Sequence, residues 1–224
     1  MILKTLYLKI GDLGLPKEYT YEFLKGSRYI CNYIEREVLA DIQFEAEGFN
    51  RISIALCSSP TREFFLNSSK VACCDIRFDR EQYDNLAEKD LPEFYIKKIK
   101  EGLNQVKKFS RIPDVEIFHG LEDFEAGGLV NKWIYKEKVF KKQSLKASLS
   151  CELTRTTFRL TLEILKDELV QFSEIILETD PDENAFEYRY KDLKVENGVL
   201  VVTSKTGDRL FHIDLGELKA ASTR

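Results

Sequence analysis

Carboxylates recur at alternate positions from Asp41 to Glu47, with Gln43 and Glu45 between them. Alternate residues of a β-strand point to the same face, so an extended segment here would bring these side chains together. Such a row could bind magnesium or supply a general acid and a general base. The same alternation is typical of the solvent-exposed face of an ordinary hairpin, and we favour that interpretation over a carboxylate enzyme.

Other residue types that carry site chemistry are few. The five cysteines are scattered among mostly apolar neighbours, which is typical of reduced thiols. Cys73 and Cys74 are adjacent, and a strand would direct them to opposite faces, where they cannot hold one ion. The two histidines, His119 and His212, are too few for a common zinc or iron site. We find no P-loop, GxGxxG loop or serine elbow, and we expect no metal and no cofactor.

A stretch of acidic residues interleaved with aromatic residues begins at position 168. Carboxylates there could attract a basic protein, and aromatic side chains could anchor it. The residues that we predict to bind such a partner are Asp180, Asp182, Glu183, Tyr188 and Tyr190. The alternative is an ordinary polar turn between two strands, from Thr179 to Asn184.

Lysines are concentrated in the middle of the chain. Residues 91–146 contain 12 basic and 8 acidic residues, whereas the flanking segments are both net acidic. These lysines could meet phosphate groups, but they lack the interleaved aromatic residues that stack on bases, and the whole chain carries a net charge of −4. We therefore keep nucleic-acid binding only as an alternative. The lysines concerned are Lys97, Lys98, Lys100, Lys107, Lys108, Lys132, Lys136, Lys138, Lys141 and Lys142.

The first part of the chain mixes strand and helix patterns. Ile2–Ile10 and Lys70–Phe78 are predicted strands, and the alternation in 42–46 and 52–56 predicts a β-hairpin around Gly48. Tyr19–Glu37 fits either a strand or a helix that begins near Ser27.

Two helices are expected before residue 128. Asp90 is a suitable N-cap for a helix over 91–110, where apolar residues recur every three or four positions. A second helix is predicted from Asp114 to Ala126, because the glycines that follow are typical of a helix end.

The remainder is dominated by strand patterns. Residues 145–153 and 158–164 alternate between apolar and polar side chains, which predicts a hairpin, and Asn197-Gly198 predicts a second tight turn. We predict an α+β fold with a mostly antiparallel sheet. An N-terminal strand and helix portion, residues 1–128, precedes a C-terminal β-meander of six or seven strands, residues 129–224. We find no linker between the portions, so one continuous domain and two domains are both compatible with the sequence.

Composition limits the class of protein further. The chain has 224 residues, of which 43% are hydrophobic and 32% charged, and it has neither an apolar run of membrane-spanning length nor a signal-peptide pattern at its start. We therefore expect a soluble cytoplasmic protein that does not contact a membrane.

The function that we favour is non-catalytic binding of a protein partner with a basic surface. Bacterial immunity proteins, which occlude the often basic active-site surface of a cognate toxin, have this general character, although no motif identifies the chain with them. An immunity-type toxin inhibitor is accordingly one form of the hypothesis. The alternatives are a carboxylate-based, magnesium-dependent enzyme and lysine-mediated binding of nucleic acid.

Overall fold

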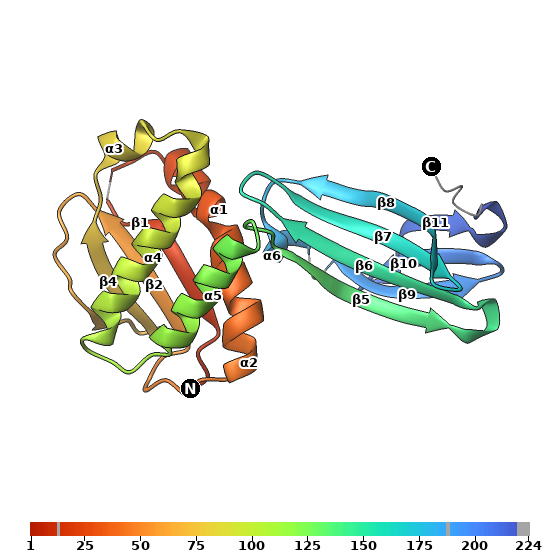
Figure 1. Cartoon of the computed structure of the whole chain (residues 1–224), viewed down its shortest axis with the longest axis horizontal. Coiled ribbons are helices and arrows are strands. Elements are labelled where there is room, and N and C mark those ends of the chain that lie inside the picture. Colours follow the sequence, from red (N-terminus) through yellow and green to blue (C-terminus); the bar gives the residue numbers. More distant parts are fainter. Residues whose placement is uncertain (13, 187–188, 219–224) are drawn as a thin grey trace. The chain divides into compact units, whose positions relative to one another are not determined.

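The computed structural model describes residues 1–12, 14–186 and 189–218, and the chain divides into two compact units. Unit 1 comprises Met1–Val130 and combines a sheet with helices, whereas unit 2 comprises Asn131–Arg224 and consists mainly of strands (Figure 1). The predicted α+β class is confirmed, and most neighbouring strands are antiparallel.

Unit 1 contains a four-stranded sheet with the order β1-β2-β4-β3. Its strands are β1 (Thr5–Ile10), β2 (Arg51–Cys57), β3 (Phe65–Leu66) and β4 (Val71–Arg77). The pairs β1–β2 and β2–β4 are parallel, and only the short β3 is antiparallel to its neighbour. The strands predicted at Ile2–Ile10 and Lys70–Phe78 are therefore present with slightly different ends.

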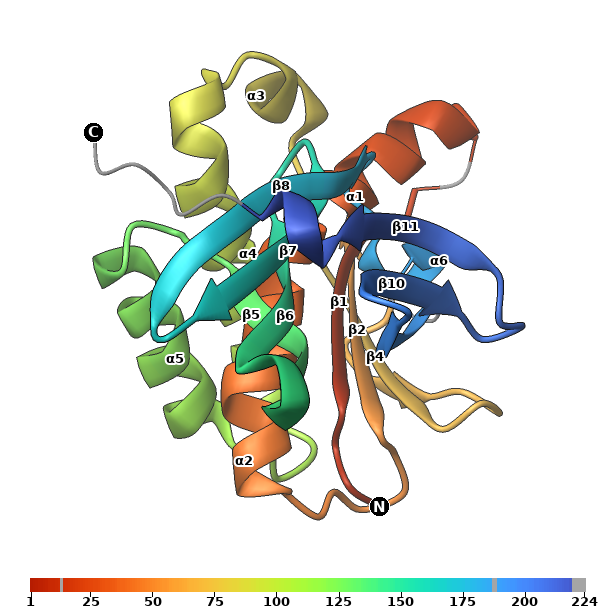
Figure 2. The same ribbon diagram turned by 90° about the vertical axis from the view of Figure 1, so that its right-hand side faces the viewer.

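The helices of unit 1 connect and cover these strands. They are α1 (Lys17–Ile34), the π-helix η1 (Glu35–Leu39), α2 (Ala40–Ile42), α3 (Arg80–Asp84), the 3₁₀ turn η2 (Glu88–Asp90), α4 (Leu91–Lys107) and α5 (Asp114–Ala126). Both predicted helices are confirmed. The helical alternative for Tyr19–Glu37 is also correct, but the predicted start near Ser27 is wrong, because α1 already begins at Lys17. Figure 2 shows α4 and α5 on the same side of β1, β2 and β4. A Cβ atom at Gly102 of α4 would lie 2.5 Å from Ile54, so only glycine permits this close approach to β2.

The hairpin predicted around Gly48 is wrong. Ala40–Ile42 is the last turn of a helix, which ends where Gln43 takes a left-handed conformation. The second predicted strand does exist as β2, but its neighbours are β1 and β4. Every residue of β2 after Arg51 is buried, so the small polar and apolar side chains on its second face are also covered. The alternation that suggested one wet face instead belongs to an internal parallel strand.

A buried ion pair joins α1 to the edge of the unit 1 sheet. The Arg28 guanidinium donates to both carboxylate oxygens of Glu35, at 2.9 and 2.6 Å. The backbone N–H of Leu6 in β1 donates to the same carboxylate at 2.8 Å. The two charged side chains are only 10% and 12% exposed. Glu35 therefore links a helix and an edge strand inside the protein.

Aromatic side chains form a second packing centre in unit 1. Phe23 of α1 is 2% exposed. Its ring lies 5.1 Å from that of Tyr83, 5.4 Å from that of Tyr95 and 6.1 Å from that of Phe78. The hydroxyl groups of Tyr83 and Tyr95 hydrogen-bond to each other at 2.8 Å. This cluster joins α1, α3, α4 and the end of β4.

The described residues of unit 2 form seven strands in two sheets, in agreement with the predicted β-meander. The sheet orders are β5-β6-β7-β8 and β11-β10-β9. The elements are β5 (Lys132–Phe140), η3 (Lys141–Gln143), β6 (Leu145–Leu153), β7 (Phe158–Lys166), β8 (Leu169–Thr179), α6 (Glu183–Phe186), β9 (Tyr190–Glu196), β10 (Val199–Ser204), β11 (Arg209–Asp214) and η4 (Leu215–Glu217).

The hairpins of unit 2 follow the predicted pattern. In β6 and β7 the apolar residues at alternate positions are buried, from Leu145 to Leu153 and from Phe158 to Ile164. Asn197 and Gly198 both have positive φ, as a tight hairpin between β9 and β10 requires. The turn between β7 and β8 also uses two positive φ values, at Asp167 and Glu168, without a glycine.

Candidate functional site

Only part of the predicted partner-binding set lies at the surface. Asp180 is exposed and Asp182 is partly exposed, in the segment between β8 and α6. Glu183 and Tyr190 are buried, with exposed fractions of 1% and 6%. Tyr188 lies outside the described residues. The partner-binding role of this set stays a prediction, and Asp180 and Asp182 are the members known to be accessible to a partner.

Tyr190 is buried at the start of β9, where the register with β10 shifts: Asp192 pairs with Thr203 and Tyr190 with Ser204, so Lys191 is an extra residue between them. Burial raises the pKa of its phenol. Its backbone carbonyl accepts a hydrogen bond from the Tyr135 hydroxyl at 2.7 Å. The pattern of aromatic residues among acidic ones therefore reflects, at this position, the core of unit 2.

Acidic side chains gather along β8 and its two ends. We call this surface the β8 acidic edge; it consists of Glu168, Glu174, Glu178 and Asp180, all of which are exposed. Glu178 is already paired with Arg159 of β7, at 2.7 Å. In the sequence, residues 167–188 contain eight acidic residues and no lysine or arginine. The β8 acidic edge is therefore the surface that we associate with a partner.

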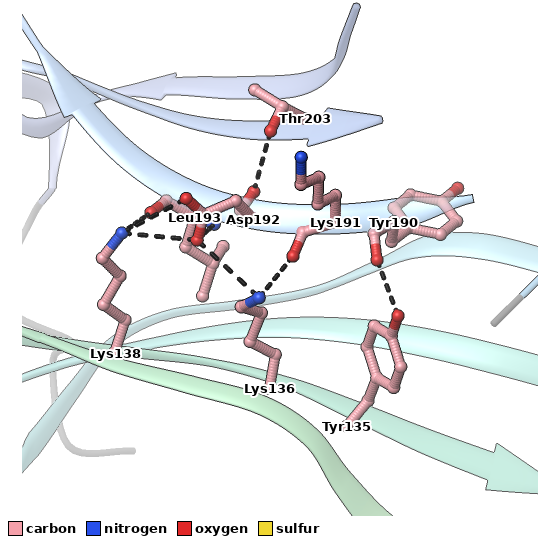
Figure 3. A network of polar contacts seen from close by, with 8 residues as sticks. All are labelled: Tyr135, Lys136, Lys138, Tyr190, Lys191, Asp192, Leu193 and Thr203. Atoms are coloured by element: carbon pink, nitrogen blue, oxygen red, sulfur yellow. Dashed lines mark hydrogen bonds and ion pairs between the residues drawn. The ribbon is translucent and has the colours of Figure 1, made fainter. Parts of the chain in front are cut away.

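A polar network joins the two sheets of unit 2 at the β5 and β9 strands (Figure 3). Tyr135, Lys136 and Lys138 of β5 donate to the backbone carbonyls of Tyr190, Lys191 and Leu193, respectively. The carboxylate of Asp192 accepts a hydrogen bond from the ammonium group of Lys138 at 3.3 Å, and it lies 3.8 Å from the ammonium group of Lys136. Side chains of one edge strand thus satisfy the free carbonyls of the other.

The charge state of Asp192 follows from this network. Partial burial acts to raise the pKa of its carboxyl. The hydrogen bonds from Lys138 and from the Leu193 N–H, together with the charges of the two lysines, outweigh that effect and lower the pKa. Asp192 is therefore held as a carboxylate whose role is to join the sheets.

We expect Asp192→Asn to lower the free energy of unfolding of unit 2 by about 1–2 kcal/mol at neutral pH, because two lysines lose their anionic partner. The pKa is lowered in the folded state, so the advantage of the native residue is present above the ordinary pKa of an aspartate and is lost as the pH falls through the folded value. Urea unfolding followed by the fluorescence of Trp133, the single tryptophan, measures the difference. Asp167→Asn, in an exposed turn, is the control; equal destabilisation by both variants would contradict the prediction.

The lysine-rich middle segment is largely engaged with acidic residues. Lys98 pairs with Glu101, Lys100 with Glu122 and Lys132 with Glu152. Lys107 pairs with Asp114, and Lys136 and Lys138 contact Asp192. A shallow groove of about 600 Å³ lies beside the network and is lined in part by Lys138, Lys141, Lys142 and Lys194, with Glu196 opposite in charge. Six of the ten lysines considered for nucleic-acid binding therefore lie beside an acidic partner, which weakens that alternative.

The carboxylates considered for a magnesium enzyme do not share a strand face. Asp41 is in α2, Glu45 forms an isolated bridge with Ile2, and Glu47 lies in a bend. Among the described residues, we find no group of three or more histidine, cysteine or acidic side chains arranged to hold a metal ion. The geometric basis of the carboxylate site, a common strand face, is thus absent.

The cysteines and the two histidines are the remaining nucleophilic and titratable residues considered in the sequence. All five cysteines are buried and none forms a disulfide, and burial raises the pKa of the Cys74 thiol to about 12. His212 and Asp214 lie together on the exposed face of β11, as their alternation with Phe211 and Ile213 predicts. His119 is exposed on α5.

Comparison with known proteins identifies no relative: no protein-family model, curated protein or solved structure matches the chain. None of the helices in the described residues is both long enough and apolar enough to cross a bilayer.

Proposed function

We propose that this protein binds a protein partner with a basic surface, and that it does so without catalysis. The observation that carries the proposal is the β8 acidic edge, in which exposed carboxylates follow one strand within a segment free of lysine and arginine. Such a surface accelerates the approach of a cationic partner and disfavours an anionic one. Of the accessible members of the predicted set, Asp180 belongs to this edge and Asp182 lies two residues beyond it.

An immunity-type inhibitor of a bacterial toxin is the form of this proposal that we favour, because the basic active-site surface of such a toxin has the required charge. A cytoplasmic location is part of the same proposal. The five cysteines support it because none of them forms a disulfide, as expected in a reducing compartment.

The test uses the full chain as an immobilised bait in a lysate of the source organism. The bound protein is identified, purified and assayed for association rate at low and high salt. We expect a basic protein, and we expect the triple variant Glu168→Gln, Glu174→Gln and Asp180→Asn to slow association by about tenfold at low salt.

The matched control is the triple variant Glu81→Gln, Glu116→Gln and Glu125→Gln, which removes three exposed carboxylates from unit 1. It should change the association rate less than about twofold. The proposal fails if the two triple variants behave alike, if the bound protein is acidic, or if nothing binds.

A further inference from the structure

The strand β8 forms one edge of a four-stranded sheet. In the sheet order β5-β6-β7-β8 it is outermost, and among the described residues β7 is its strand partner. An edge strand of 11 residues presents a row of backbone N–H and C=O groups on its open side. The opposite edge strand, β5, differs because its side chains reach across to β9.

Exposed apolar side chains accompany the open backbone of β8. Leu169 is 66% exposed, Ile175 is 47% exposed and Val170 is 39% exposed. Val170 and Ile175 lie on one face of the sheet, opposite Leu165 and Thr161 of β7. Exposed apolar side chains beside the open backbone of an edge strand are features by which an added strand gains specificity and affinity.

Glu174 restricts which strand can be added. It is opposite Leu162, a fully buried residue of β7, so its side chain starts from the core-facing side of the sheet. The register with β7 also skips Gln171 and Ile176, which bends the strand locally. An inward charge disfavours pairing with a neutral strand, whereas the bulges interrupt regular pairing with any strand at the two skipped positions.

A second copy of this chain is a poor occupant. Two β8 strands placed side by side would bring together two acidic edges, each containing Glu168, Glu174 and Asp180. A strand that carries lysine or arginine would instead be attracted by the carboxylates of the β8 acidic edge. The acidic edge therefore excludes self-pairing and selects a cationic strand.

We propose that an extended, lysine- or arginine-rich segment of the partner pairs with β8 and adds a fifth strand to this sheet. This inference rests on the proposed function and specifies how the partner is held. Main-chain hydrogen bonds to β8 bind the segment, and its cationic side chains meet Glu174 and the acidic residues at both ends of the strand.

The probe is a ten-residue peptide of alternating lysine and threonine, titrated into the full chain at low salt up to millimolar concentration. A peptide of the same sequence with D-residues at alternate positions keeps the charge but cannot form a regular strand. We expect the all-L peptide to bind at least tenfold more tightly. We also expect it to slow amide hydrogen exchange at least tenfold within Leu169–Thr179, while the amides of β1 are unaffected.

Two variants locate the binding edge. Ile175 and Ile134 occupy one cross-strand row through Ser150 and Thr161, at opposite edges of the sheet, and both are exposed. Ile175→Lys should weaken binding of the all-L peptide at least fivefold, whereas Ile134→Lys, with the same change of charge, should alter it less than twofold.

Strand addition is refuted if the all-L peptide does not bind, if both peptides bind equally, or if exchange in β8 is not slowed. In those cases the proposed function still stands when the purified partner distinguishes the two triple carboxylate variants. It fails independently when the partner does not distinguish them.

Discussion

Replacing Glu35 by alanine should lower the free energy of unfolding of unit 1 by about 3–5 kcal/mol, among the largest effects that we expect from a single substitution. The Glu35 carboxylate accepts hydrogen bonds from both terminal nitrogens of Arg28 and from the N–H of Leu6. The side chains of Arg28 and Glu35 are both nearly buried. Its removal leaves the guanidinium charge without its bidentate partner and the β1 edge without an acceptor.

The helices of unit 1 make this effect measurable. Apart from the four-residue α6, the α-helices of the described residues are all in unit 1, so circular dichroism at 222 nm during urea unfolding reports mainly on that unit. Trp133, on β5, reports on unit 2 by fluorescence and provides an internal comparison.

A double variant separates loss of the pair from loss of packing. Arg28→Met combined with Glu35→Met replaces both charges by apolar side chains, and it should recover most of the stability that Glu35→Ala loses. The prediction is wrong if Glu35→Ala destabilises by less than about 1 kcal/mol, or if the double variant is less stable than the single one.

Phe23→Ala should destabilise unit 1 by about 3–5 kcal/mol, because it empties the centre of the aromatic cluster. The truncation also removes the edge-to-face contacts of the Phe23 ring with Phe78 and Tyr95 and its tilted contact with Tyr83. The helical signal in urea unfolding again measures the change.

Tyr21 provides the control on the same helix, since its side chain is 50% exposed. Tyr21→Ala should change the free energy of unfolding by no more than about 0.5 kcal/mol. Similar effects of the two substitutions would show that the inward face of α1 has been assigned incorrectly.

Sequence patterns predicted those elements that bury one face and leave the other wet. The hairpin of β6 and β7 alternates cleanly, and α5 has a clear apolar stripe followed by two glycines, so periodicity and turn residues suffice. The hairpin prediction for Asp41–Cys57 was wrong because β2 is buried on both faces and pairs with strands that are distant in the sequence. Small residues such as Ser53 and Ala55 look polar or neutral to a periodicity argument, although they lie inside.

The candidate site was predictable only as a segment. Charge alone indicated the acidic stretch, but the burial of Glu183 and Tyr190 depends on packing that no local pattern contains. The ion pair of Glu35 could have been predicted from the sequence. Arg28 precedes Glu35 by two helical turns, so the two side chains lie on the same face of a helix. That signal was hidden by the uncertainty between helix and strand in Tyr19–Glu37.

The two sheet topologies have different consequences for how the chain folds as it is synthesised. Strands β5 to β8 pair in chain order through short turns, so their contacts close small loops. In contrast, β1 must wait for β2 across the 40 residues between Ile10 and Arg51, and β2 completes its pairing only when β4 has emerged. Unit 1 therefore has the higher contact order. Although it is translated first, its apolar strand edges stay unpaired for longer, and during that time chaperones can bind them or the chain can aggregate.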